Sequence, residues 1–386
     1  FNQGVTRDAA DLLQGKVAGL QITTPSGDVT QSTRIRLRGV STLQNDQGPF
    51  IVIDGVPGGD LQTVAPQDIE SISVLKDASA TAVFGVRGAN GVILVTTKRG
   101  EEGKANIDIN FTSTLKTYSK LPSKLDSYDA LMLRNRVIEG ELPYAEESWT
   151  YYQPQQVIDK YRYPANLAES ERYPNVDWVD ELLKDYATSY NANINVSGGT
   201  KFAKYFVSLD YAHEGDLYKK FDNDRGYEPG FGFDRVNVRS NMDFSLTKTT
   251  LFKMNLSGSH AVKRGSGAQY EYLVWSAFYG IAPDAFLPRY SDGLFGFYKL
   301  SPTHSETNSM QYLSVGGLTK TSTDRLNTDF TLEQDLGFIT KGLKAHARLA
   351  FDNSFQETDR GIDDTRDWET DDAKWIDPET GEVHSN

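Results

Sequence analysis

The chain has 386 residues, which is enough for two domains or more. Its formal net charge of −13 argues against a nucleic-acid partner, and the absence of cysteine excludes disulfides and thiolate metal sites. The five histidines show no ligand spacing, so no metal or other cofactor is predicted. No apolar run reaches the roughly 18 residues of a transmembrane helix. A mean hydropathy of −0.50 still permits a transmembrane β-barrel, in which only alternate residues meet lipid.

Residues 1–102 are predicted to form a small α/β domain. Residues 9–13 predict a short helix, and residues 34–39 alternate charged and apolar side chains, which predicts a strand with one arginine-bearing face. Phe50–Ile53 predicts a strand that ends at the turn Asp54-Gly55, and Ile69–Leu75 predicts another strand.

Three glycines spaced by three, Gly85, Gly88 and Gly91, stand at the start of an apolar run at 91–97. A phosphate-binding loop needs a strand, then glycines, then a helix whose N–H groups face the anion. Here a helix-like segment at 77–83 comes first and the strand comes last, and the spacing matches neither nucleotide fingerprint. The glycines are therefore predicted to form a tight turn, because glycine tolerates positive φ angles.

After residue 102 the chain changes to long segments of alternating polar and apolar residues. The clearest segment places Val236 and Val238 opposite Arg235, Asn237 and Arg239. The predicted strands, 6 to 12 residues long, lie around the roughly 9–11 residues that cross a bilayer at a tilt. The seven strands are predicted at 107–112, 191–197, 205–211, 235–246, 252–257, 325–333 and 343–352. Alternation alone does not separate a barrel from a soluble antiparallel sandwich.

The connections between these strands favour the barrel. Long links at about 117–189, 214–231, 262–321 and 354–386 alternate with short ones at 199–201, 247–248 and 337–342. An outer-membrane barrel has this asymmetry, with long loops outside and short periplasmic turns. Structureless insertions above about 15 residues are uncommon in compact soluble domains. Residues 103–386 are therefore predicted to form the N-terminal part of a β-barrel with long extracellular loops, the first of which carries helices near 128–139 and 177–183.

The number of strands is too small for the domain that precedes them. Seven strands cannot enclose a domain of about 100 residues, whereas barrels of about 22 strands hold such a plug in their lumen. We therefore expect the chain to be a fragment, with roughly fifteen strands (22 − 7) outside it. The complete fold predicted is a transmembrane antiparallel β-barrel of about 22 strands with an N-terminal α/β plug.

Several stretches of the chain carry a family resemblance. They are LQGKVAGLQI at 13–22, IRLRG at 35–39, PFIVIDGVP at 49–57, IESISVLKDASA at 69–80, GVRGANGVI at 85–93, NINVSGG at 193–199 and YFVSL at 205–209. These motifs resemble the plug and early barrel of the SusC/RagA family of TonB-dependent outer-membrane transporters. The resemblance is strong from residue 4 to about residue 100, and the loops share only their length with the family.

The resemblance implies a function in transport rather than catalysis. It implies a location in the Gram-negative outer membrane, in contact with its lipid, and import of oligosaccharides or, in some members, oligopeptides. It also implies two protein partners, a SusD-like surface lipoprotein acting as a lid and TonB as the source of energy, and it leaves open a dimer of transporter–lid pairs. The segment that contacts TonB and the later strands are expected to lie outside these 386 residues.

Candidate site residues follow from the expected position of the plug. Four arginines, Arg34, Arg36, Arg38 and Arg87, are predicted to face the polar barrel wall and to pair with its carboxylates, which would let a pull remove the plug without a large apolar penalty. The alternative is that they are solvated charges on a strand face. Turn positions in the plug are predicted at Gly39, Gly55, Gly85, Gly88 and Gly91.

The predicted outer loops contain the five tryptophans, Trp149, Trp178, Trp275, Trp368 and Trp375. Aromatic faces stack on sugar rings but also bury against proteins, and we predict a lid interface for most of them. The acidic stretch at 222–226 has no Glu at the twelfth position of a calcium loop, where Phe233 stands, so a bare acidic loop is predicted.

Two functions of other classes stay open at this stage. A glycan hydrolase needs two carboxylates that face each other across a cleft, and no such pair stands out in the sequence. A surface glycan-binding or structural β-protein without transport would also have long loops and an acidic composition.

Overall fold

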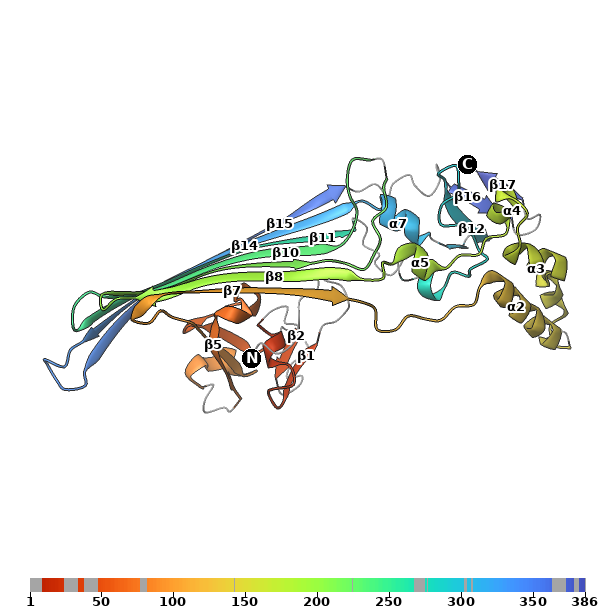
Figure 1. Cartoon of the computed structure of the whole chain (residues 1–386). Helices are drawn as coiled ribbons and strands as arrows, with labels where there is room; N and C mark the ends of the chain where they lie inside the picture. Colours follow the sequence, from red (N-terminus) through yellow and green to blue (C-terminus); the bar gives the residue numbers. More distant parts are fainter. Residues whose placement is uncertain are drawn as a thin grey trace.

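The computed structural model describes residues 9–23, 34–37, 48–76, 82–141, 143–223, 225–266, 275, 277–301, 304–306, 308–362, 373–377 and 382–385. Predictions that concern Arg38, Gly39 and Trp368 lie outside the described residues. Figure 1 shows a small N-terminal unit against one face of a long sheet, with helices and short strands at one end of that sheet. We call the described residues 9–97 the plug and the long sheet the wall.

The plug contains two sheets. Strands β1 (Leu20–Thr23) and β2 (Arg34–Leu37) form an antiparallel pair, and β3 (Phe50–Ile53), β4 (Val56–Pro57), β5 (Ile69–Leu75) and β6 (Val92–Thr97) form a four-stranded sheet. Its order is β4-β3-β6-β5, in which β3 and β6 run parallel. The strands predicted at 50–53, 69–75 and 92–97 are therefore confirmed.

Short 3-10 turns connect the strands of the plug and complete its core. They are η1 (Asp11–Leu13), η2 (Leu61–Thr63), η3 (Pro66–Asp68) and η4 (Ala82–Gly88). Leu12 and Leu61 pack with Ile93 and Val95 of β6 in one buried cluster. The apolar run after the glycines is thus the central strand of the plug, which is why both of its faces are apolar.

The wall is one antiparallel sheet whose strands follow in chain order. The strands are β7 (Gly103–Lys116), β8 (Ala187–Gly199), β9 (Ala203–Glu214), β10 (Gly232–Ser245), β11 (Thr250–Ser266), β14 (Leu318–Asp335) and β15 (Lys344–Ile362). All seven predicted strands are confirmed. They extend beyond the predicted ranges because hydrogen-bonded pairing continues into polar residues that do not alternate.

The long connections lie at one end of the wall (Figure 1), and among the described residues all but the one at 215–231 carry helices or strands. The first carries α2 (Ser127–Glu141), η5 (Glu146–Tyr151), α3 (Gln155–Arg162), α4 (Leu167–Arg172) and α5 (Trp178–Leu182). The later ones add α7 (Ser309–Val315) and the sheet formed by β12 (Phe295–Ser301), β13 (His304–Glu306), β16 (Ala373–Ile376) and β17 (Val383–Ser385). No helix in the described part of the chain is long and apolar enough to cross a membrane.

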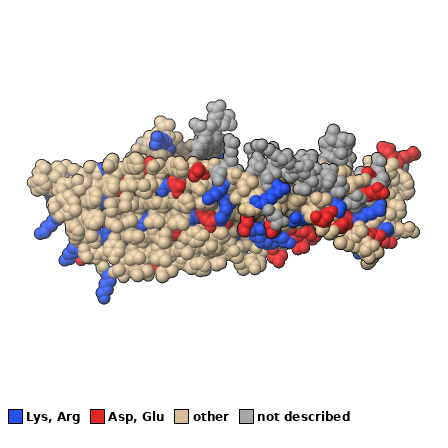
Figure 2. Space-filling view, turned by 90° about the horizontal axis from the view of Figure 1, so that it is seen from above, with Lys and Arg blue, Asp and Glu red and all other residues tan. Residues whose placement is uncertain are grey.

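The wall is apolar on the outside and polar against the plug. Ile194, Leu209 and Phe351 are exposed on its outer face, at 44%, 49% and 63%, although they are large and apolar. Asn193 and Asp210, at alternate positions on the plug side, are fully buried at 0% exposure. Figure 2 shows the outer face as largely uncharged, with charged residues gathered over the loop end. This arrangement reverses that of a soluble sheet protein, whose polar residues face water.

The link between plug and wall is short and tightly placed. Only residues 98–102 separate the end of β6 from the start of β7. A Cβ atom at Gly100 would lie 2.3–2.6 Å from backbone atoms of Tyr205 in β9, so only glycine fits at this contact. Arg99 anchors the same link, since its guanidinium donates to Asp243 at 2.6 Å and to Asn255 at 2.9 Å on the wall.

Candidate functional site at the plug–wall interface

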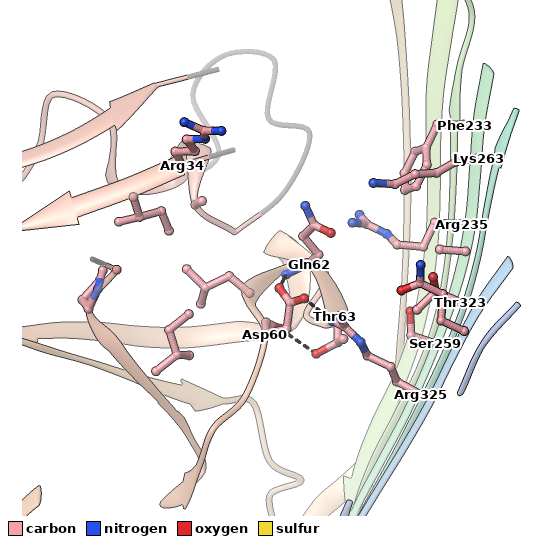
Figure 3. A pocket seen from close by; sticks show the side chains of 18 of the residues that line it. Arg34, Asp60, Gln62, Thr63, Phe233, Arg235, Ser259, Lys263, Thr323 and Arg325 are labelled. Carbon is pink, nitrogen blue, oxygen red and sulfur yellow. Dashed lines mark hydrogen bonds and ion pairs between the residues drawn. The ribbon is translucent and has the colours of Figure 1, made fainter. Parts of the chain in front are cut away.

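The arginines predicted to hold the plug do not pair with wall carboxylates among the described residues, although two of them lie beside the wall. Arg34 and Arg36, on β2, line a cavity beside the wall (Figure 3), and neither forms an ion pair with any described residue. Arg87, in η4, lies over the ring of Phe50 at 5.9 Å from its centroid. Within the described residues, no pair between these three arginines and a wall carboxylate is present.

The ion pairs observed at this interface mostly have the opposite polarity, with arginine on the wall and carboxylate on the plug. Arg239 of β10 lies between Asp54 and Asp68 of the plug, at 3.7 Å and 3.9 Å. All three side chains are at most 6% exposed. Buried charges of this kind depend on one another, because each would otherwise be poorly solvated.

Each plug carboxylate is held in place by hydrogen bonds. Asp54 follows β3 at a φ of 50°, and it accepts from the backbone N and the Oγ1 of Thr97 at 2.8 Å and 2.6 Å. Asp68 ends η3 and accepts from the Oγ of Ser208 on β9 at 2.6 Å. Since Thr97 is the last residue of β6, Asp54 also ties the turn after β3 to the end of the central strand.

Further polar contacts continue along the wall. The amide of Asn241 donates to Thr97 Oγ1 and to the carbonyl of Lys98, both at 2.8 Å. Arg348 of β15 pairs with Asp329 and donates to the carbonyl of Asp54. Closer to the loop end, Arg325 of β14 pairs with Asp60. The plug is therefore attached mainly by groups that water can solvate once they separate.

The pKa of Asp68 gives a test of this burial. Burial raises it above its ordinary value of 3.8, although the hydrogen bond from Ser208 and the charge of Arg239 act in the opposite direction. A carboxyl with a raised pKa binds more protons in the folded protein than in the unfolded chain, so stability falls as pH rises from about 3.8 through the raised pKa. We expect Asp68→Asn to abolish this component, as measured by urea midpoints of plug release at a series of pH values. Identical profiles for the two proteins would contradict it.

The turn glycines differ in their backbone. Gly55, Gly85 and Gly91 have positive φ angles of 81°, 59° and 89°, which only glycine adopts at low cost. Gly88 does not, and its carbonyl accepts the N–H of Gly91 at 2.9 Å, which closes the turn before β6. The tight turn predicted from the glycine spacing is thus present, with positive φ at the first and third positions.

The described tryptophans lie in the loop region but have different environments. Trp178 is fully buried, with its ring 5.5 Å from that of Phe286, in a cluster that also holds Phe278 and Tyr312. It is a core residue of the folded loops, so the predicted lid contact is wrong for Trp178 in this structure. Trp149 is 50% exposed and stacks on Tyr152, Trp275 is 38% exposed, and Trp375 stacks on His384.

Acidic and histidine side chains are spread over the interface and the loops. Across the described residues, no group of three or more His, Cys, Asp or Glu side chains is arranged to hold a metal ion. The acidic loop at 222–226 includes a residue outside the described set, and Asn223 donates to the carbonyl of Ser314 at 2.9 Å.

Comparison with known proteins identifies the class. Residues 2–92 match the family model described as TonB-dependent Receptor Plug Domain. The chain is 33% identical to TonB-dependent receptor SusC of Bacteroides thetaiotaomicron, over 63% of this chain and 23% of SusC. It is 32% identical to TonB-dependent receptor P3 of Formosa agariphila, over 72% of this chain and 24% of that receptor. The chain thus spans about a quarter of the length of these relatives.

The fold is also shared with a solved structure. The structure of the RagAB peptide transporter covers 90% of this chain, with 39% of its own chain, at a TM-score of 0.68 and 24% identity. The match covers both plug and wall. The chain is therefore a plug domain followed by the first strands of a TonB-dependent receptor barrel. Within that class, it belongs to the SusC/RagA family.

Proposed function

We propose that the receptor containing this chain imports a bulky nutrient, an oligosaccharide, across the Gram-negative outer membrane. In this proposal residues 1–102 are the plug domain and residues 103–386 begin the barrel. TonB supplies the energy and a SusD-like surface lipoprotein closes the entrance. Oligopeptide import by the same mechanism is the second candidate, because one solved structure that covers 90% of the chain is described as a peptide transporter.

The observation that carries the proposal is the polar attachment of the plug to the inner face of an outwardly apolar wall. The pairs of Arg239 with Asp54 and Asp68, and of Arg325 with Asp60, break without exposing a large apolar surface. A plug that must move and return benefits from such contacts, because apolar burial would oppose each opening by roughly 25 cal/mol per Å². A surface glycan-binding protein without transport has no need for this arrangement.

The outer face supports a membrane location. At the short-turn end, Phe202, Phe244, Phe252 and Phe330 form a row with ring centroids 6.2–6.3 Å apart. At the loop end of β10, Asp234 binds Tyr211 at 2.9 Å and His213 at 2.7 Å. Ten residues separate Phe244 from Asp234, or about 33 Å along the strand, which at a tilt of about 40° spans roughly 25 Å. That is the height of the apolar band of an outer-membrane barrel.

A reversible crosslink between plug and wall tests the proposal. The chain has no cysteine, so Asp68→Cys with Ser208→Cys introduces one defined pair where the two side chains touch at 2.6 Å. Oxidation is expected to stop uptake of labelled oligosaccharides by cells, and reduction to restore it, while each single variant is insensitive to oxidant. Continued uptake with the crosslink formed would contradict a moving plug. Absence of any import in the unmodified receptor would favour the non-transport alternative.

A further inference from the structure

A cavity of about 690 Å³ lies between the plug and the wall, toward the loop end (Figure 3). Its plug side includes β2 and the residues around η2, such as Asp60 and Gln62, and its wall side includes Phe233, Ser259 and Thr323. Ligand-binding pockets measure roughly 300–1,000 Å³, so the cavity has the size of a site for part of an oligosaccharide.

The charge of the lining is strongly biased toward positive. Among the described residues, five cationic side chains line the cavity, namely Arg34, Arg36, Arg235, Lys263 and Arg325. Asp60 is the one acid among the described lining residues, so the lining carries +4 (5 − 1), and Asp60 is the ion-pair partner of Arg325. Asp210, outside the lining, attracts Arg235. The bias is opposite in sign to the net charge of −13 of the whole chain.

Apart from Arg325, which pairs with Asp60, these cations are not those that attach the plug. The contacts of Arg239, Arg348 and Asn241 do that, and none of these residues lines the cavity. Arg34 and Arg36 form no hydrogen bond or ion pair with a described residue, and their partners across the β1–β2 pair are Thr23 and Gln21, which carry no charge. Like charges around a partly enclosed space repel more strongly than in bulk water, and an entering anion relieves that repulsion.

We propose that this cavity binds the acidic groups, carboxylate or sulfate, of an anionic oligosaccharide during its import. Arginine binds such groups through paired N–H donors, and lysine binds them as a point charge. The remaining lining suits a sugar, since Gln62, Ser259 and Thr323 offer amide and hydroxyl groups and Phe233 offers an aromatic ring. This inference rests on the proposed import function and adds the class of solute.

The experiment measures binding of paired oligosaccharides by the full-length receptor purified with its lid protein. Each uronate-containing or sulfated oligosaccharide of a panel is paired with its carboxyl-reduced or desulfated derivative, so that length and linkage are the same. We expect the charged members to bind and their neutral derivatives to bind at least about 10-fold more weakly. Raising the salt concentration is expected to weaken only the charged members, because exposed charges are screened.

Variants on the two sides of the cavity test its position. Lys263→Gln on the wall and Arg34→Gln on the plug are each expected to weaken binding of charged members by roughly 10- to 100-fold and to leave neutral members unchanged. The matched control is Lys253→Gln, on the same strand and face near the short-turn end, where Lys253 pairs with Glu333. It is expected to bind like the unmodified receptor. Heat-modifiable migration on gels confirms that each variant forms a folded barrel.

The outcomes separate this inference from the import function. Equal binding and uptake of charged and neutral members would contradict the inference that the solute is anionic, but it would leave the proposed import of oligosaccharides standing. Uptake of acidic peptides, without binding of any oligosaccharide of the panel, would contradict the proposal that the solute is an oligosaccharide and would support oligopeptide import. An unchanged affinity in both Lys263→Gln and Arg34→Gln, with charged members still preferred, would overturn the assignment to this cavity.

Discussion

Replacement of Arg239 by methionine is expected to weaken attachment of the plug by about 3–5 kcal/mol, because removing one partner of a buried pair leaves the other charge without compensation. Here two carboxylates, those of Asp54 and Asp68, lose the same partner. Methionine keeps much of the volume of the arginine, so the loss reports on charge more than on packing. The measurement is the urea concentration at which the plug of the full-length receptor becomes sensitive to protease.

Two further variants control this prediction. Arg134→Met removes an ion pair with Asp284 in the loops, but the Arg134 side chain is 43% exposed, so a change below about 1 kcal/mol is expected. Combining Arg239→Met with Asp54→Asn and Asp68→Asn is expected to recover much of the loss, because no buried charge remains unpaired. If the plug were equally stable with Arg239 and with Met at this position, the ion pairs of Arg239 would make no net contribution to the attachment of the plug.

Gly91→Ala is expected to destabilise the plug by about 2–5 kcal/mol through two separate effects. Its φ of 89° costs a residue with a side chain roughly 1–2 kcal/mol. In addition, a Cβ atom would lie 2.1 Å from Cδ2 of Leu37 and 3.1 Å from the carbonyl of Leu75, and overpacking of this kind costs about 1–3 kcal/mol. Thermal unfolding of the plug, followed by protease sensitivity, measures the sum.

Gly58→Ala isolates the backbone effect. Gly58 has nearly the same φ, 87°, but nothing lies within 4 Å of the position that a Cβ atom would take, so only the roughly 1–2 kcal/mol of strain is expected. Leu37→Ala in the Gly91→Ala background is expected to return part of the packing loss. If Gly91→Ala and Gly58→Ala had the same effect, the contact with Leu37 would be shown to be unimportant.

The strands of the wall were predictable from sequence because the central part of each alternates with period two. Val236 and Val238 are separated by Asn237, and the structure places the valines and the asparagine on opposite faces. The short turns were predictable for the same reason, since the alternation stops and resumes within a few residues. The folded loop region was predicted only in part. The helices near 128–139 and 177–183 have local signals, whereas the core around Trp178 is completed by Phe278 and Tyr312 from a distant part of the chain.

The partners at the plug–wall interface could not be predicted, because they depend on where two separately folded parts meet. Arg239 was recognised as a polar position of its strand, yet nothing near it in the sequence indicates Asp54 or Asp68. The separation of Arg325 from Asp60 is 265 residues. For the positive charge of the cavity, the sequence offered one signal, the arginine-bearing face of β2. The wall side of the cavity is assembled from four strands, β10, β11, β14 and β15, which lie far from β2 in the sequence.

The link at Gly100 has a mechanical consequence for the plug. Residues 98–102 connect the C-terminal end of β6 directly to the wall. Strand β3 runs parallel to β6, with Phe50 opposite Val92 and Ile53 opposite Val95. A pulling force on the N-terminal side of the chain would act on β3 at Phe50, whereas the anchor on the wall holds β6 at its opposite end, after Thr97. The hydrogen bonds of this pair are then strained together in shear instead of being peeled one by one. The stretch before Phe50 can be drawn out first, while the central strand stays fastened to the wall.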